Sequence, residues 1–464
     1  MDRIKYPLYT AVYVSFVFFI VVPVVYTLGM ALFADGSLIQ NLALLDHGTF
    51  LLLAKSCIIA FSIALLSTFF GAVFGFFLYK TYVPFRNFFK IALLVPLFIS
   101  PYILAVAWKD FFYLIFNNTE FISSYIGVIL VLVSIFTPLS MLIIGSALSN
   151  INTQLEETGF VITNFRRVVL KITLPLIKPA LISSFVLVFI FSISEFSVPA
   201  FFGVKVFTTE IFTQFSAFYN HSLAILQSVI LISICILLLF AERKHITGAP
   251  FLSLSVKGSG SKFYNLKNKN RLSLVFLSGW FFISVVLPFV VLLIQSFKDG
   301  TSKFIQAVEL LIPTFGNSVG LAFLGALIIV FVGFVAAYPA WGSNNTRKTK
   351  SFDWLLLIVF AIPSTIFGIS LIKFYNHPIL DFIYSGYAII LIGYVGKFSF
   401  ISAKLIGNAI RQIPNSLDEV AQIEGVTFFR RLLKILIPLI MPTLCVLHYV
   451  INNFGLVFYN KTTS

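Results

Sequence analysis

Long apolar stretches dominate the chain, separated by short segments that contain Gly, Pro, Asn and charged residues. The stretches reach the roughly 20 residues that a membrane-spanning helix needs, and they lack the ten-residue alternation of outer-membrane strands. The pattern predicts an all-α polytopic membrane protein of about eleven spans, each satisfying its own backbone hydrogen bonds. The predicted spans are residues 6–32, 55–79, 91–108, 121–148, 176–200, 222–241, 272–296, 316–341, 354–374, 386–403 and 439–458.

The chain also repeats itself. Residues 156–179 share ten identities in 24 positions with residues 419–442, at an offset of 263. A second match, at an offset of 262, pairs Gly71 with Gly333. Such self-similarity indicates a duplicated unit. Because a unit of six spans returns the chain to the same side, the halves are expected to form a parallel repeat.

The predicted organisation is a first transmembrane half (1–243), a basic linker (244–271) and a second half (272–464). The linker contains a Gly-Ser-Gly-Ser run, which is typical of a flexible connection. Counted from the repeated stretch, the second half is one span and one loop shorter than the first. We therefore expect it to lack its last helix, and one interpretation is a truncated and inactive product.

Composition and charge placement agree with a membrane protein. The chain is 59% hydrophobic and 11% charged, with a mean hydropathy of +1.01, whereas soluble domains carry about 25% charge. With the N-terminus in the cytoplasm, 24 Lys and Arg lie on the cytoplasmic side and 7 on the other, and Lys397 lies within a span. This excess of Lys and Arg on one side predicts the orientation of the chain in the membrane, with the N-terminus in the cytoplasm. The net charge of +15 therefore indicates contact with anionic lipid or a cytoplasmic partner, not with nucleic acid.

Few residues suggest chemistry within the chain. The three cysteines and five histidines show no disulfide or metal-ligand spacing. The segment 258–263 (GSGSKF) lacks the spacing of a nucleotide-binding P-loop. No catalytic or metal site is predicted, and the chain is not expected to be an enzyme. Glu195 is a candidate residue of a translocation path, with a packing carboxylate near Pro199 as the alternative.

The duplicated stretch lies between the fourth and fifth spans of each half. Each copy mixes apolar positions at helical spacing with Arg and Lys, has a polar break in the middle, and ends at a proline before the next span. This pattern predicts two short helices at the membrane surface, joined by a turn. A single copy would indicate an interfacial helix. Two copies in matching loops favour a symmetric partner that docks on both.

The second copy resembles the EAA signature of ABC importer permeases. Glu419, Ala421, Gly425 and Pro438 carry the resemblance. The first copy departs from the signature: it keeps Glu156 and Pro175, but it has Ile162 where the glycine belongs, and Gly159 nearby is expected to permit the turn. The fused layout of two halves is similar to the permeases of ferric-iron importers, with thiamine and phosphonate importers as relatives.

The resemblance implies a transport subunit in a bacterial inner membrane. It implies that each loop sits in a cleft of one subunit of a homodimeric ATPase, which binds ATP and Mg²⁺, and that an extracytoplasmic protein delivers the substrate. It further implies that Glu156 and Glu419 anchor the loops and that Gly425 forms the turn. Arg167 and Arg430, with their neighbours Arg166 and Arg431, either contact the ATPase or face lipid as topology determinants.

Two other classes stay open. A secondary transporter of twelve spans would share the parallel repeat. It would need buried charges for ion coupling and a charged signature after the second span, where the segment KTYVPFRN has no acidic residue. A membrane enzyme would need clustered carboxylates or histidines at a membrane face.

Overall fold

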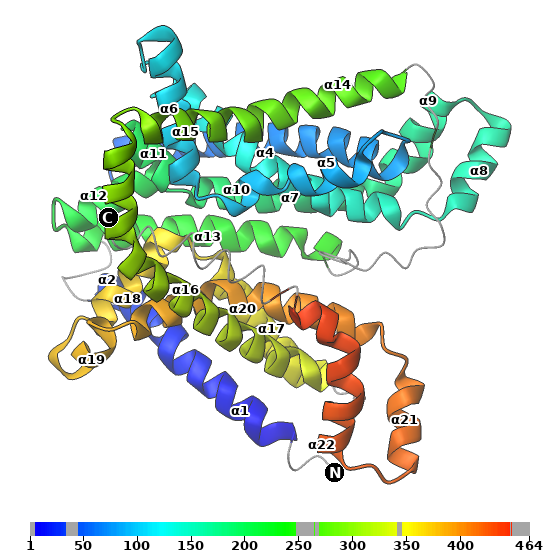
Figure 1. Ribbon diagram of the computed structural model, residues 1–464. Helices are drawn as coiled ribbons and strands as arrows, with labels where there is room; N and C mark the ends of the chain where they lie inside the picture. The colour runs from blue at the N-terminus through cyan, green and yellow to red at the C-terminus, as the bar shows by residue number, and fades with distance from the viewer. Residues whose placement is uncertain are drawn as a thin grey trace. The chain divides into compact units, whose positions relative to one another are not determined.

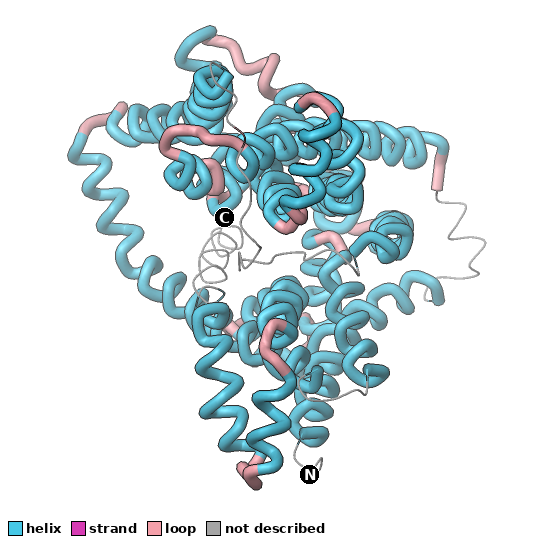
Figure 2. The backbone as a smooth tube through the Cα atoms, turned by 90° about the vertical axis from the view of Figure 1, so that its right-hand side faces the viewer, coloured by secondary structure: helices cyan, strands magenta, loops and turns pink. Residues whose placement is uncertain are grey.

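The computed structural model describes residues 5–33, 45–246, 264, 269–340, 346–445 and 447. These residues form helices joined by short loops, and the described part of the chain contains no strand (Figure 2). Among the described residues, eight helices are long and apolar enough to cross a membrane. Two helix pairs, bent by 96° and 101°, bring the number to ten if each pair is one broken span. The prediction of an all-α polytopic membrane protein is therefore confirmed.

Ten of the predicted spans, from 6–32 to 386–403, correspond to these helices and helix pairs. The eleventh span, 439–458, lies mostly outside the described residues, because its helix is described only to residue 445 and at residue 447. The predicted linker 244–271 also lies mostly outside them, apart from its two ends and Tyr264.

The chain divides into two compact units, neither of which is a sequence half. Unit 1 comprises residues 1–43, 220–236 and 309–464, and unit 2 comprises residues 44–219 and 237–308. Each unit therefore combines the first span of one half with most of the other half. The helices α13 (His221–Ile246) and α16 (Thr301–Ala337) run through both units.

Unit 1 joins the first predicted span to the second half. Besides parts of α13 and α16, its elements are α1 (Lys5–Phe16), η1 (Val17–Val21), α2 (Val22–Phe33), η5 (Tyr338–Ala340), α17 (Thr346–Ala361), α18 (Ser364–Tyr375), η6 (Pro378–Leu380), α19 (Asp381–Tyr384), α20 (Ala388–Arg411), α21 (Asn415–Ile423), α22 (Phe428–Arg431) and η7 (Leu432–Leu436). The buried ring of Phe352 in α17 lies 5.3–5.7 Å from three rings of α1, those of Tyr9, Tyr13 and Phe16. These contacts pack the first span against the ninth.

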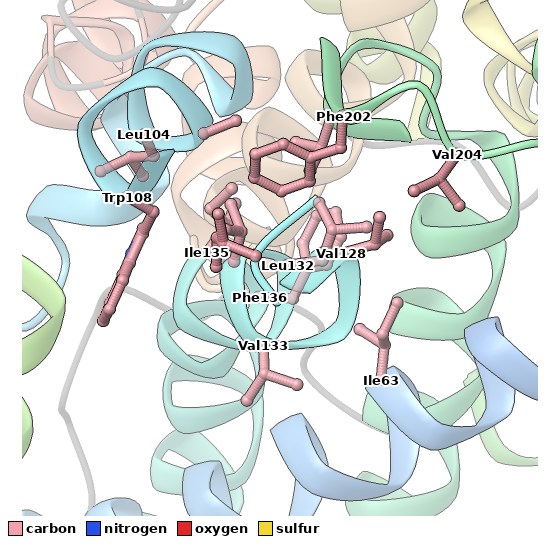
Figure 3. Close-up of a cluster of buried hydrophobic side chains, with 14 of the residues drawn as sticks. Ile63, Leu104, Trp108, Val128, Leu132, Val133, Ile135, Phe136, Phe202 and Val204 are labelled. Carbon is pink, nitrogen blue, oxygen red and sulfur yellow. The ribbon is translucent and has the colours of Figure 1, made fainter. Parts of the chain in front are cut away.

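Unit 2 joins the seventh span to the first half. Its elements are α4 (His47–Lys80), α5 (Arg86–Ala92), η2 (Val95–Phe98), α6 (Pro101–Phe116), α7 (Tyr125–Ser149), α8 (Thr153–Ile162), α9 (Phe165–Val168), η3 (Val169–Thr173), α10 (Leu174–Ser194), α11 (Ser197–Phe202), α12 (Phe207–Ser216), α14 (Lys269–Phe281), η4 (Phe282–Val286) and α15 (Leu287–Phe297). The helices α4, α7 and α10 pack together. In Figure 3, α7 contributes Val128, Leu132 and Phe136 to an apolar cluster with Ile63 of α4 and Phe202 of α11.

The seventh span completes the packing of unit 2. Leu277 of α14 is fully buried, and the Trp280 ring stacks 4.8 Å from the ring of Phe70 in α4. The following helix, α15, packs against α6. Both units thus take in a first span from the other half of the sequence.

The repeat found in the sequence has structural counterparts. The bent third span of each half breaks at residues 99–100 and at residues 362–363, which are 263 positions apart. At the second helix of each half, Gly71 lies against Ser140, and Gly333 lies against Ser402, 262 positions further on. Both glycines lie where a Cβ atom would come within 2.5 Å of the Cβ of the facing serine. The absence of a side chain lets the two helix backbones approach closely.

Four prolines explain the four π-helical turns described in the chain. The turns η1, η3, η4 and η7 end at residues 21, 173, 286 and 436, in each case two residues before a proline. A proline has no N–H for the carbonyl four residues earlier, and its ring clashes with that carbonyl. The wider π turn accommodates the clash without ending the helix.

We expect Gly71→Ala to loosen the contact between α4 and α7. The new Cβ would lie 2.4 Å from Ser140 Cβ and 2.8 Å from the backbone nitrogen of Met141, so the helices must separate. Such overpacking costs about 1–3 kcal/mol and lowers the midpoint of thermal unfolding in detergent. The matched control is Gly279→Ala in α14, where nothing lies within 4 Å of the new Cβ. An equal loss in both variants would contradict the packing argument.

Candidate functional site

The duplicated stretch folds into a helical hairpin in each half. The first hairpin is made of α8 and α9 and lies between α7 and α10 in the chain. The second is made of α21 and α22 and follows α20. Figure 1 shows each pair folded back on itself beyond the end of the long helices next to it. The prediction of two short helices and a turn thus describes both copies.

Asparagine side chains set the ends of the helices in the first hairpin. Asn152 accepts a hydrogen bond from the N–H of Gln154 at the start of α8, and Asn164 accepts one from the N–H of Arg167 at the start of α9. Such caps satisfy N–H groups that have no partner within the helix. The turn therefore lies at residues 163–164.

Gly159 has a different role from the turn role expected for it. It lies inside α8, where a Cβ would come within 2.6 Å of Ile172 and 3.2 Å of Val168. Its lack of a side chain therefore allows α8 to pack closely on the helix that returns from the turn. The position calls for glycine because of close packing, not because of backbone conformation.

A buried ion pair fastens the first hairpin to α4. Lys80 Nζ, at the end of α4, lies 2.7 Å from Glu156 Oε2, and both side chains are fully buried. The Thr173 hydroxyl donates a hydrogen bond to the other carboxylate oxygen at 3.1 Å. Burying two charges is costly unless they are paired and hydrogen-bonded, and this site meets both conditions. Glu156 therefore holds the hairpin from the inside and presents no charge at the surface.

The second hairpin is closed by an ion pair between its own two helices. Arg431 Nη1 of α22 lies 2.5 Å from Asp418 Oδ1 of α21, and both side chains are 2–3% exposed. Gln422 Nε2 donates to the other oxygen of Asp418 at 2.6 Å. The turn contains Gly425 with φ of +71°, a conformation that side chains with a Cβ rarely adopt.

The buried acids show that the two hairpins are related by a shifted register. The sequence repeat pairs Glu156 with Glu419, but Glu419 is exposed, and the acid at the equivalent buried position is Asp418. The first helices are related by an offset of 262 and the second helices by 263, because the second turn is longer. The doublets Glu156-Glu157 and Asp418-Glu419 carry this signal in the sequence.

The remaining predicted loop residues are distributed as follows. Arg167 and Arg430 are exposed, whereas Ala421 is 7% exposed, at the position equivalent to Gly159. Pro175 and Pro438 follow the π turns η3 and η7. These prolines do not start a new helix: the chain is helical from residue 165 to residue 194, and again from 428 to 445.

Apolar side chains are exposed near the ends of both first helices. Val161 and Ile162 are 87% and 80% exposed at the end of α8, and Ile423 is 83% exposed at the end of α21. Val161 and Ile423 are equivalent positions in the two hairpins. An exposed apolar tip carried by a rigid hairpin is a surface suited to a partner protein.

Two charged residues lie at helix breaks within predicted spans. The Glu195 carboxylate accepts hydrogen bonds from the backbone N–H and the hydroxyl of Ser197, between α10 and α11. These contacts agree with a packing role, and a place on a translocation path stays a prediction. Lys397, for which no role was predicted, donates hydrogen bonds to the carbonyls of Ile362 and Phe360 at the bend between α17 and α18. Carbonyls at a helix end lack helical partners, and the ammonium group supplies one.

Comparison with known proteins agrees with the resemblance seen in the sequence. Residues 329–460 match the family described as the binding-protein-dependent transport system inner membrane component. The chain is 27% identical over 384 residues to the Fe(3+)-transport system permease protein FbpB 2 of Haemophilus influenzae, covering 81% of this chain and 72% of the relative. It is 24% identical over 463 residues to the ferric transport system permease protein FbpB of Actinobacillus pleuropneumoniae, covering 92% and 66%. The chain is thus similar to permease subunits of ABC importers over most of its length.

The apolar helices and the matched inner-membrane family indicate a multi-pass inner-membrane protein. The matched family is described as a component of binding-protein-dependent transport systems. Among the described residues, no group of three His, Cys, Asp or Glu could hold a metal ion. The two hairpins are therefore the candidate functional site of this chain.

We expect Glu156→Gln to destabilise the permease strongly, because it leaves Lys80 buried without its charged partner. Breaking a buried pair costs about 3–5 kcal/mol and should lower the midpoint of thermal unfolding in detergent. The double variant Lys80→Met/Glu156→Leu removes both charges and should recover most of the loss.

The control for this prediction is the exposed pair formed by Asp299 and Lys303, with 68% and 69% of their side chains exposed. Asp299→Asn should change the free energy of unfolding by less than about 1 kcal/mol. A Glu156→Gln variant as stable as Asp299→Asn would show that the ion pair does not hold the hairpin.

Proposed function

We propose that the chain is the permease of a ferric-iron importer driven by ATP hydrolysis in a separate, homodimeric ATPase. The observation that carries the proposal is the pair of hairpins, one in each half, with exposed apolar tips at equivalent positions. Two equivalent docking sites on one chain suit a partner with two identical subunits. The relatives are ferric transport permeases by name, which supports iron as the substrate.

Charge placement supports the orientation. Both hairpins belong to the side that carries 24 of the 32 Lys and Arg residues. In this proposal that side is cytoplasmic, together with the N-terminus. ATP and Mg²⁺ are then bound by the ATPase on the same side, and the substrate-binding protein delivers its cargo from the other side.

The geometry of the first hairpin suggests how motion reaches the membrane. The helix formed by α9, η3 and α10 is continuous, so a displacement of α9 acts directly on a span. Glu156 ties α8 to Lys80 at the end of α4, and α4 packs against α10 and α7. A push on the hairpin therefore acts on several packed helices together. In this mechanism Glu156 is an internal anchor, and the ATPase meets Val161, Ile162 and the exposed arginines.

The predicted loop residues take complementary roles in the proposal. Arg167 and Arg430 are exposed and are available to acidic groups of the ATPase. Glu419 is exposed and so would contact the partner directly, while Asp418 anchors its hairpin as Glu156 does. The predicted halves 1–243 and 272–464 then each supply one lever to the ATPase dimer.

Cross-linking at the hairpin tips tests the docking. We expect cysteines introduced at Val161 and at Ile423 to cross-link, in intact cells, to a protein that is photolabelled by an azido analogue of ATP and contains a P-loop sequence. The control is Phe218→Cys, which is 67% exposed between α12 and α13 and lies on the opposite side in the proposed topology. Labelling from Phe218→Cys but not from the tips would overturn the proposed docking.

Transport measurements separate the proposal from a secondary transporter. Cells expressing the permease with its ATPase and binding protein should take up radiolabelled ferric iron, and arsenate, which depletes ATP, should reduce uptake to background. A proton ionophore added while ATP is maintained should leave uptake largely intact. Uptake that follows the ion gradient and ignores ATP would instead favour a secondary transporter.

A further inference from the structure

Tyr264, from the segment that joins the two halves, is bonded to the end of α4. Its N–H donates to the carbonyl of Lys80 at 2.7 Å, and its carbonyl accepts from the N–H of Tyr82 at 3.3 Å, which makes a parallel bridge with Thr81. The side chain is buried, with 7% of the residue exposed. The linker is thus held at this point by paired backbone hydrogen bonds.

The ring of Tyr264 lies among aromatic rings from three different helices. It meets Phe160 of α8 and Phe165 of α9 edge to face, at centroid distances of 5.3 and 5.5 Å. It stacks on Phe76 of α4 at 6.3 Å. One side chain therefore contacts both helices of the first hairpin and the span to which that hairpin is fastened.

The hydroxyl of Tyr264 adjoins the buried ion pair. Burial, together with the neighbouring Glu156 carboxylate, raises the pKa of the Tyr264 phenol, so the phenol stays neutral next to the carboxylate. The hydroxyl has no hydrogen-bond partner of regular geometry among the described residues. The ring contacts and the backbone bridge hold the side chain in place.

We propose that Tyr264 is a positioning residue that locks the first hairpin to α4, which makes the linker a part of the coupling apparatus. The proposal rests on the proposed function, because the position of the hairpin matters for transport only if the hairpin carries the motion of an ATPase. The second hairpin is closed by its own Asp418–Arg431 pair. The two hairpins are thus held by different means, and the linker acts on the first.

The test compares Tyr264→Ala with Tyr264→Phe in vesicles that contain the permease, its ATPase and its binding protein. Tyr264→Ala removes three ring contacts, so the iron transported per ATP hydrolysed should fall roughly tenfold. Tyr264→Phe keeps the ring and should retain most of this ratio. The ratio, measured per assembled complex, would not change if the substitution altered only the amount of folded protein. If Tyr264→Ala does not accumulate, Tyr264→Leu is measured against the same criterion.

The control is Tyr387→Ala, an exposed tyrosine just before α20, which should leave the ratio unchanged. An unchanged ratio in Tyr264→Ala, with the tip at position 161 still cross-linking the ATPase, would overturn the role of Tyr264 and leave the proposed function intact. The proposed function itself fails if the unaltered protein neither cross-links an ATPase nor transports iron with ATP.

Discussion

The interior of a bilayer offers no water to unpaired backbone groups, so each span of this permease must satisfy its own N–H and C=O groups. A proline inside a helix leaves one carbonyl without its helical partner, because it has no N–H to donate. Pro138, Pro179 and Pro313 lie inside α-helices that simply continue, and two other arrangements occur elsewhere in the chain. Before Pro23, Pro175, Pro288 and Pro438, a π turn lets the helix continue. At the third span of each half the helix bends by about 100° instead, and in the second half Lys397 covers carbonyls at the bend.

These two solutions have different mechanical consequences. A helix that continues through a π turn transmits displacement along its axis, and both hairpins enter their spans in this way. A bent span leaves backbone groups at its break outside the helical hydrogen-bond pattern, and transporters of repeated design use such irregular backbone near their binding sites. The chain therefore has continuous helices after both hairpins and broken helices at the third span of each half. The same arrangement occurs in both halves, at the offset of the sequence repeat.

The spans, the repeat and the hairpins could be predicted from the sequence, because hydropathy and self-similarity are properties of the chain itself. The partners of the buried acids could not be predicted. Lys80 ends a span and resembles an ordinary topology charge, and Arg431 is one of two adjacent arginines of which Arg430 is exposed. The pairing of Glu156 with Glu419 was wrong for a related reason: one extra residue between the two helices of the second hairpin shifts the register of α21. When one offset is applied to both helices of the hairpin, a shift of one residue in the first helix is not seen.

The first span of each half packs with the other half of the sequence, and this exchange helps to explain what the linker between the halves does. Each compact unit takes its first span from the other half, so neither half could complete its own packing if it were separated. A linker is then not needed to keep the halves together, since the packing of the spans already does so. A linker can instead fix the position of the elements that it contacts. Tyr264 is the described residue at which the linker contacts α4 and the first hairpin. This contact lies beside the ion pair that fastens the first hairpin. The linker therefore acts on the first hairpin directly, and on the second hairpin only through the rest of the fold.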